Sequence, residues 1–131
     1  MKLTFIGADH EVTGSCHYLS VNGKNILIDY GMEQGVNVLV NQPLPVSEAE
    51  IDYVLITHAH VDHTGLLPLL YAHGFRGEIH TTKATSELST IMLKDCAFIQ
   101  ESEAEWKSRK GKRKGEKEIQ PLFTVDDATG C

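Results

Sequence analysis

Four side chains able to bind metal ions fall within the segment Thr57-His58-Ala59-His60-Val61-Asp62-His63-Thr64-Gly65. In extended backbone, residues two apart point the same way, so His58 and His60 are predicted to share one metal ion. A turn would then bring Asp62 and His63 to a second ion. Nitrogen and carboxylate donors without thiolate favour zinc, with manganese or iron as alternatives at the carboxylate-richer position. The segment therefore predicts a centre for two zinc ions. Its spacing differs from that of a helical HExxH site, in which two histidines lie four residues apart.

The number of donors in this segment is smaller than two metal ions require. A catalytic zinc takes about three protein ligands plus water, so two ions need about six ligands. The other candidates are His10, His17, His73, His80, Asp126 and Asp127. None of them lies in a recognisable ligand pattern, and each is expected to be a surface or core residue. Residues 1–131 are therefore expected to hold an incomplete site with little or no catalytic activity.

The elements around the segment predict how it is held. The aliphatic and β-branched run 53–57 is typical of a strand covered on both faces, and it leads directly to His58. Further strands are expected at 2–7, 16–21, 25–29 and 78–81. Asn22-Gly23 is a strong hairpin signal between the second and third of the five strands. The metal segment thus follows the carboxyl end of a strand, where α/β sheets commonly place their sites.

Helices and loops fill the remaining chain. Residues 31–50, with two glycines and two prolines, predict a loop, and 66–73 predict a short helix that ends at Gly74. Pro68 is acceptable there because it falls in the first turn. A longer helix is expected from Lys83, with apolar residues three and four apart, fading after Trp106. A further element begins within 121–127. The order predicts an α/β (α+β) fold with a mixed sheet and covering helices.

Composition limits the class of protein. With 131 residues, 41% of them apolar, the chain forms at most one small domain, and no apolar run approaches the ~20 residues that cross a bilayer. Cys16, Cys96 and Cys131 are scattered and form no CxxC pair, so neither a disulfide framework nor a structural zinc knuckle is indicated. These features predict a cytoplasmic protein with no membrane association.

Positive charge is concentrated in one segment. The formal net charge is −6, yet seven of the twelve Lys and Arg lie between Lys107 and Lys117, leaving five basic against seventeen acidic residues elsewhere. We expect residues 107–118 to be a basic, flexible segment. One interpretation is a solvated helix end and loop; the other is a surface that attracts phosphates.

Beyond the metal segment, three stretches carry a family resemblance. They are Gly7-Ala8 with Glu11-Val12-Thr13-Gly14-Ser15-Cys16, then Leu27-Ile28-Asp29-Tyr30-Gly31, and Gly74-Phe75-Arg76-Gly77 through Ile91-Met92-Leu93. Together with His-x-His-x-Asp-His, they resemble the metallo-beta-lactamase superfamily and, within it, the beta-CASP subgroup. That subgroup includes the pre-mRNA cleavage endonuclease of the polyadenylation machinery, ribonuclease J and related exonucleases.

The resemblance implies a fold in which two sheets are sandwiched between helices (αββα). Residues 1–131 would be the N-terminal half of this metallo-beta-lactamase domain, with the second half and the beta-CASP insertion absent and one apolar sheet face uncovered. A later His, a later bridging Asp and a C-terminal His of the family pattern have no counterpart here. The remaining ligands and the general acid would therefore lie beyond residue 131.

The resemblance also implies a reaction. In the intact protein, metal ions bound by His58, His60, Asp62 and His63 would hydrolyse phosphodiester bonds of single-stranded RNA. Asp62 and His63 are the predicted catalytic residues, and Asp29 would orient a ligating His. One alternative is another hydrolase of the same fold, acting on a thioester, lactone or beta-lactam; a second is a non-catalytic metal-binding fragment. Endo- or exonuclease mode and a homo-oligomeric state stay open.

Overall fold

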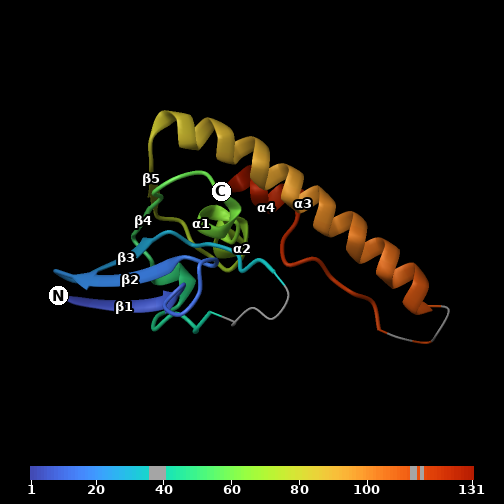
Figure 1. Cartoon of the computed structure of the whole chain (residues 1–131), viewed down its shortest axis with the longest axis horizontal. Coiled ribbons are helices and arrows are strands. Elements are labelled where there is room, and N and C mark those ends of the chain that lie inside the picture. Colours follow the sequence, from blue (N-terminus) through green and yellow to red (C-terminus); the bar gives the residue numbers. More distant parts are fainter. Residues whose placement is uncertain (36–40, 113–114, 116) are drawn as a thin grey trace.

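A single five-stranded mixed sheet organises the chain (Figure 1). The computed structural model describes residues 1–35, 41–112, 115 and 117–131. The strands are β1 (Lys2–Gly7), β2 (Cys16–Val21), β3 (Lys24–Ile28), β4 (Tyr53–Leu55) and β5 (Glu78–His80), in that spatial order. β1, β2 and β3 pair antiparallel, whereas β3, β4 and β5 pair parallel. The predicted mixed sheet is confirmed, with β4 and β5 slightly shorter than expected.

The predicted hairpin joins β2 to β3. Asn22 and Gly23 both have positive φ, 49° and 74°, as a type I′ turn requires, and Val21 faces Lys24 across the turn. This turn fixes the register between the two strands, which continues to the pair His17 and Ile28. The hairpin thereby determines where β3 ends and where Asp29 begins the next segment.

Helices follow the parallel strands. They are the 3-10 turn η1 (Glu48–Glu50), α1 (Val61–Thr64), α2 (Leu67–Ala72), α3 (Lys83–Lys112) and α4 (Val125–Gly130). Pro68 lies in the first turn of α2, as expected. The helix α1 was not predicted, because its residues were expected to form a loop and turn. Its single turn is closed by backbone bonds from Thr64 N–H to the His60 carbonyl and from Gly65 N–H to the Val61 carbonyl, and Thr64 Oγ1 also donates to the carbonyls of Ala59 and His60.

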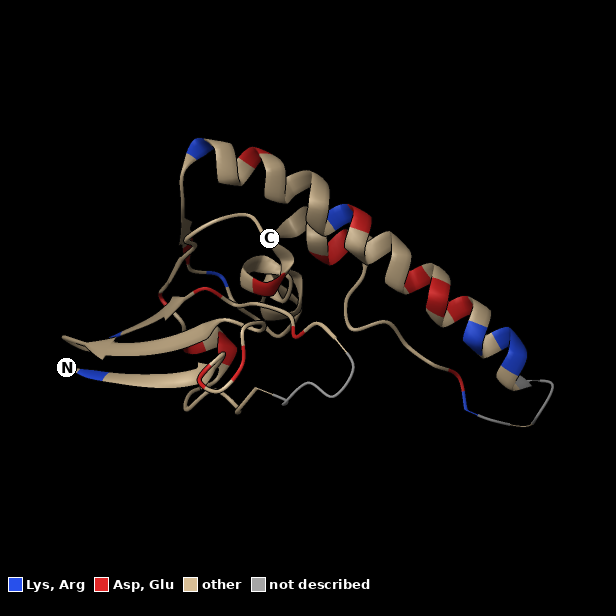
Figure 2. Cartoon of the chain, viewed as in Figure 1, with Lys and Arg blue, Asp and Glu red and all other residues tan. Residues whose placement is uncertain are grey.

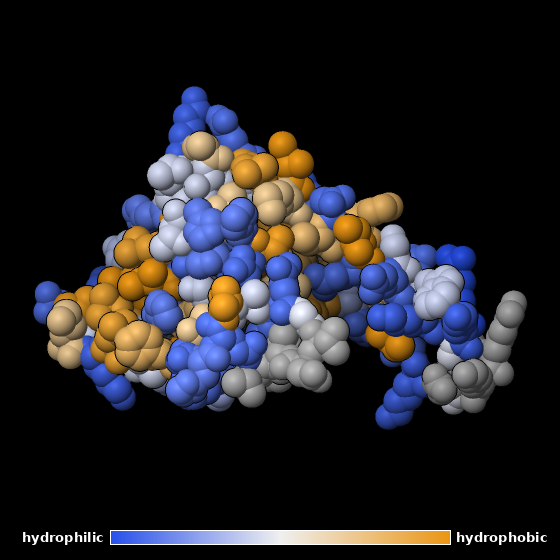
Figure 3. Space-filling view, in the orientation of Figure 1, coloured by the Kyte–Doolittle hydropathy of each residue, from blue (hydrophilic) through white to orange (hydrophobic). Residues whose placement is uncertain are grey.

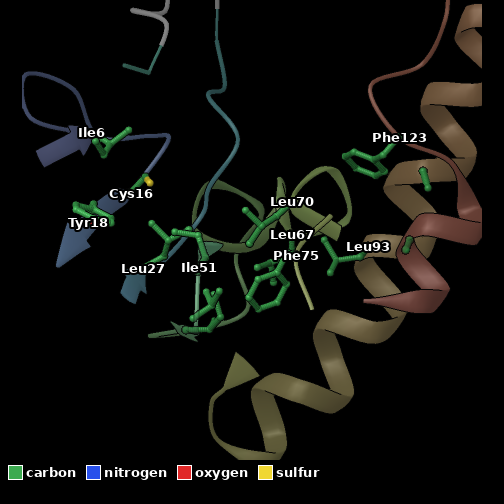
Figure 4. Close-up of a cluster of buried hydrophobic side chains, with 14 residues drawn as sticks. Ile6, Cys16, Tyr18, Leu27, Ile51, Leu67, Leu70, Phe75, Leu93 and Phe123 are labelled. Carbon is green, nitrogen blue, oxygen red and sulfur yellow. The ribbon is translucent and has the colours of Figure 1, made fainter. Parts of the chain in front are cut away.

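One face of the sheet is packed into the core. Tyr18, Leu27 and Val54 lie side by side on β2, β3 and β4 and are buried. They belong to one hydrophobic cluster, which also contains Leu67 and Leu70 of α2 and extends to α3 and α4 (Figure 4). From α3, α4 and the segments beside them, the cluster includes Phe75, Leu93, Ala97, Phe123 and Ala128. The sheet and all the major helices thus share a single core.

The opposite face of the sheet remains open. Leu3, Phe5 and Leu55 are each between 40% and 55% exposed, and apolar side chains gather over the strands in Figure 3. The expectation that the strand 53–57 is covered on both faces is therefore wrong for this chain, because Leu55 is 40% exposed on the open face. An uncovered apolar face is what the family resemblance implied for residues 1–131.

The helix α3 extends well beyond the sheet (Figure 1). It continues to Lys112 instead of fading after Trp106, so the beginning of the basic segment 107–118 is helical. Pairs one turn apart explain the extension: Lys107 with Glu103, Arg109 with Glu105, and Lys110 over the Trp106 ring. Residues 113, 114 and 116 of that segment lie outside the described chain. Figure 2 shows the basic residues gathered at this end of α3.

Within the described ranges, no helix is both long enough and apolar enough to span a bilayer.

Candidate metal centre

The metal segment is held by a second stretch of backbone, residues 29–32. Tyr30 N–H donates to the His63 carbonyl at 2.9 Å, and Met32 N–H donates to the Val61 carbonyl at 3.1 Å. From the other side, Ser15 N–H donates to the Asp62 carbonyl at 2.8 Å. Because the carboxyl ends of β3 and β4 lie side by side in the parallel part of the sheet, the segments that follow them meet directly. The backbone carrying Asp62 and His63 is therefore fixed by long-range hydrogen bonds.

Gly31 permits this close approach. A Cβ atom placed on Gly31 would lie 1.7 Å from the Asp62 carbonyl oxygen, far inside any allowed contact. Gly31 N–H also donates to the Ser15 carbonyl at 2.9 Å, which links the three segments of the site. A side chain at position 31 would push the loop 29–32 away from α1. The glycine is thus a requirement of the site geometry.

Asp29 lies beneath the metal segment and accepts hydrogen bonds from several directions. Its backbone has φ 59°, a left-handed conformation that Asp tolerates better than most residues, and its side chain is almost fully buried. Thr57 N–H donates to Oδ1 at 2.9 Å, and Ser15 Oγ donates to Oδ2 at 3.2 Å. His63 Nδ1 lies 2.7 Å from Oδ2. An ionised carboxylate accepts only, so the proton of neutral His63 belongs on Nδ1 and its Nε2 lone pair is free.

The four predicted ligands form two pairs of donor atoms. His58 Nε2 and His60 Nδ1 face one another at 3.2 Å, and Asp62 Oδ2 lies 3.6 Å from His63 Nε2. Two nitrogens bound to one tetrahedral zinc at about 2.0–2.1 Å lie about 3.3 Å apart, so the first pair matches the edge of such a site. The second pair combines one imidazole and one carboxylate, also ordinary zinc ligands. The donor chemistry of the loop therefore fits metal ions.

Comparison with known proteins identifies the family of the chain. The family model for the metallo-beta-lactamase superfamily matches residues 11–125. The chain belongs to the metallo-beta-lactamase superfamily. The fold expected from the sequence is confirmed by this match and by the mixed sheet with its helices.

Three relatives show the branch of the superfamily. A ribonuclease of Thermus thermophilus is 43% identical over 100 residues, covering 76% of this chain and 23% of the relative. The transcription termination factor FttA of Methanosarcina mazei is 37% identical, covering 72% and 16%. Cleavage and polyadenylation specificity factor subunit 3-I of Arabidopsis thaliana is 38% identical, covering 71% and 14%. The beta-CASP subgroup predicted from the sequence is confirmed by these relatives, and the chain spans less than a quarter of the length of each.

The remaining candidate ligands do not join the metallo-beta-lactamase loop. His73 pairs with Glu48 at 2.9 Å and His80 with Glu78 at 3.1 Å. His17 packs edge-on against the Phe5 ring on the open sheet face, and Asp127 caps α4 by accepting from Thr124. His10 and Asp126 are likewise placed in no metal-binding group. Among all the residues that the structure describes, no three or more His, Cys, Asp or Glu side chains are arranged to hold one metal ion.

Three residues that support the superfamily motif were not assigned a role from the sequence. Ser15 and Thr57 donate to Asp29, and Gly31 allows the loop 29–32 to touch α1. Ser15 and Gly31 do lie in the stretches that carry the family resemblance, which is the one signal that marks them. Next to Ser15, burial raises the pKa of the Cys16 thiol to about 12, with smaller contributions from Asp29 and Glu33. Cys16 is therefore a neutral core residue beside the site.

Proposed function

We propose that this chain carries part of the active site of a metal-dependent ribonuclease, an enzyme that hydrolyses RNA phosphodiester bonds in the cytoplasm. The observation that carries the proposal is the presence of two pairs of donor atoms in the segment after β4. Asp29 contacts His63 in one of these pairs, and the chain is related to a ribonuclease. The other relatives bear names of RNA-directed machinery, a transcription termination factor and a cleavage and polyadenylation subunit. These relationships favour RNA over a thioester, lactone or beta-lactam as the substrate.

His58, His60, Asp62 and His63 are the residues that would hold the metal ions, which we propose to be two zinc ions. Such ions supply Lewis acidity, which lowers the pKa of water and stabilises negative charge on phosphoryl oxygens. The three imidazoles contribute neutral donors and Asp62 contributes a negative charge. This combination keeps the net positive charge that attracts a phosphodiester.

Two residues of the chain have further roles in the proposed reaction. Asp62 lies beside His63 Nε2, and its carboxylate is suited to accept a proton from the attacking water and to align it. His63 keeps its proton on Nδ1 because Asp29 accepts it at 2.7 Å, and Nε2 consequently faces the reacting centre as a lone pair. Single-stranded RNA is the substrate we propose, because a flexible strand brings its phosphates to a loop at the sheet edge more readily than a duplex does.

Residues 1–131 alone would be inactive. Each donor pair supplies two ligands, whereas a catalytic zinc requires about three from the protein. The groups that complete the coordination, and the general acid for the leaving oxygen, would come from elsewhere in the intact protein.

The test compares residues 1–131 with the full-length protein that its gene encodes. Zinc content by mass spectrometry and cleavage of end-labelled single-stranded RNA are measured on both, with His60→Ala as the matched control. We expect about two zinc ions and RNA cleavage in the full-length protein, both lost with His60→Ala, and no cleavage by residues 1–131. Hydrolysis of a thioester or lactone without RNA cleavage would replace the ribonuclease by another hydrolase of the fold. RNA cleavage unaffected by His60→Ala would overturn the proposed centre.

A further inference from the structure

The hydroxyl of Thr57 lies between the buried carboxylate and a second imidazole. Thr57 Oγ1 is 3.1 Å from Asp29 Oδ1 and 3.0 Å from Asp29 Oδ2. On its other side, the same oxygen is 3.0 Å from His58 Nδ1. The Asp29 carboxylate thus reaches His63 directly and reaches His58 through one hydroxyl.

Hydrogen-bonding chemistry determines the direction of the two hydrogen bonds that link Asp29, Thr57 and His58. Asp29 is an acceptor only, so the single proton of the Thr57 hydroxyl is directed to Asp29. The oxygen of Thr57 then presents only lone pairs to His58, and a stable contact at 3.0 Å requires a proton on His58 Nδ1. If the hydroxyl instead donated to His58, its lone pairs would face the negative carboxylate, which is unfavourable at this distance. Neutral His58 therefore carries its proton on Nδ1.

The proton on Nδ1 leaves a lone pair on the His58 atom that faces His60. With the proton on Nδ1, the Nε2 atom of His58 holds a lone pair, and it is this atom that lies 3.2 Å from His60 Nδ1. The ring is also held in orientation, because rotation would break the contact with Thr57. The rings of His58 and His63 are direct neighbours, with centroids 4.0 Å apart.

We propose that Thr57 is a positioning residue: its hydroxyl links the Asp29 carboxylate to His58 by hydrogen bonds. One buried acid thereby fixes the proton position of two imidazoles that are proposed to bind metal. The inference concerns the hydroxyl of Thr57, and its consequence for metal affinity rests on the proposed function. The Thr57 side chain supplies the hydroxyl, whereas the bond from its backbone N–H to Asp29 at 2.9 Å does not depend on the side chain and would remain in a substituted protein.

Nuclear magnetic resonance on the metal-free chain tests the proton position without any activity assay. Residues 1–131 labelled with nitrogen-15 histidine are examined at about pH 8.5, above the ordinary range of histidine titration, by long-range proton–nitrogen correlation. We expect both His58 and His63 to carry the proton on Nδ1 in the unmodified chain. His58 protonated mainly on Nε2 in the unmodified chain would overturn the proposal without any variant.

Two substitutions isolate the hydroxyl. Thr57→Val keeps the shape but removes the hydroxyl, and Thr57→Ser keeps the hydroxyl but removes the methyl group. Since Thr57 is exposed, we expect both variants to fold. In Thr57→Val, His58 should lose its preference for Nδ1. His63 should keep its own, because its contact with Asp29 at 2.7 Å is much shorter than its contact with Thr57 Oγ1 at 3.4 Å. Thr57→Ser should resemble the unmodified chain. An unchanged His58 in Thr57→Val would refute the role of the hydroxyl.

Zinc affinity of the full-length protein provides the second readout. Competition with a fluorescent chelator should show binding weakened about ten- to hundredfold in Thr57→Val, the range typical for a group that orients a ligand, and little changed in Thr57→Ser. Equal affinity in all three proteins would contradict the proposed role. A protein that binds zinc and responds in this way but leaves RNA intact would overturn the ribonuclease assignment alone, which separates the two failures.

Discussion

The metal segment and the outer half of α3 are held in opposite ways. Around the metal segment, backbone groups of residues 15, 29–32 and 61–63 bond to one another over long sequence separations, and Asp29 is only 2% exposed. In the outer half of α3, the ion pairs join residues one turn apart, such as Glu105 with Arg109, and Phe98 and Trp106 are more than half exposed. Its tertiary hydrogen bonds come from side chains, such as that of Ser108 to Ile119. Tertiary hydrogen bonds between backbone groups fix the first region, whereas local pairs, helical propensity and side-chain bonds to the returning chain support the second.

This difference matches what the proposed metal-binding function requires of each region. Donor atoms for a metal ion must be fixed to within a fraction of an ångström, and only groups whose orientation is determined by buried partners achieve this. Exposed pairs one turn apart on a helix contribute about 0.2–0.5 kcal/mol each, enough to extend a helix but not to position a site. Substitutions should therefore have large effects at the metal segment and small ones in outer α3.

The largest effect is expected from Gly31→Ala. Its new Cβ atom would overlap the Asp62 carbonyl, so the loop 29–32 must move and the backbone bonds to α1 must weaken. We expect a loss of about 3 kcal/mol in the free energy of unfolding, measured by urea denaturation. Gly23→Ala is the control, because its Cβ meets nothing and only its positive φ is unfavourable, which costs about 1 kcal/mol. Equal losses in the two variants would show that the tight contact at Gly31 does not matter.

Asp29→Asn should have the next largest effect. Thr57 N–H, Ser15 Oγ and His63 Nδ1 surround the carboxylate, and an amide NH₂ would face one of these donors. We expect unfolding free energy to fall by about 2 kcal/mol, the cost of an unsatisfied buried group, and zinc affinity of the full-length protein to fall about ten- to hundredfold.

The matched control for this change is Asp52→Asn, on a carboxylate that pairs with Lys24 near the surface. Its effect on stability should be much smaller than that of Asp29→Asn, because water screens and replaces an exposed pair, and zinc affinity should be unchanged. If Asp29→Asn were as mild as Asp52→Asn, the network around the carboxylate would not be what holds the site.

The smallest effect is expected from Ser108→Ala in outer α3. Ser108 Oγ accepts from Ile119 N–H at 2.9 Å and donates to the Ile119 carbonyl at 3.2 Å, tying the returning chain to the helix. Because Ile119 is exposed, water replaces these bonds, and we expect a loss of about 0.5–1 kcal/mol with no change in zinc affinity. Ser102→Ala, at an exposed position of the same helix, controls for helix propensity. A loss above that of Asp29→Asn would reverse the comparison between the two regions.

Sequence reasoning recovered most of the elements and left specific parts of the site open. The five strands, the Asn22-Gly23 turn and the helix after Lys83 follow from local patterns and are confirmed. The short helix α1 was not predicted, because it is held by long-range backbone bonds to Ser15 and to residues 30–32. The end of α3 was placed too early, since side-chain pairs extend the helix through a charged run. The roles of His58, His60, Asp62 and His63 as ligands stay predictions.

The sequence by itself determined which donor side chains stand on one loop, their spacing and the strand that precedes them, because these depend on residue identity and on the period of neighbouring side chains. Only the tertiary structure decided how the donors are aimed. Asp29 and His63 are 34 residues apart in the chain, and no local pattern reveals that they lie 2.7 Å apart in space. Nor does a local pattern reveal that the Asp62 carbonyl lies too close to Gly31 for any side chain there. Such contacts depend on β3 and β4 lying side by side in parallel, which is a property of the whole sheet.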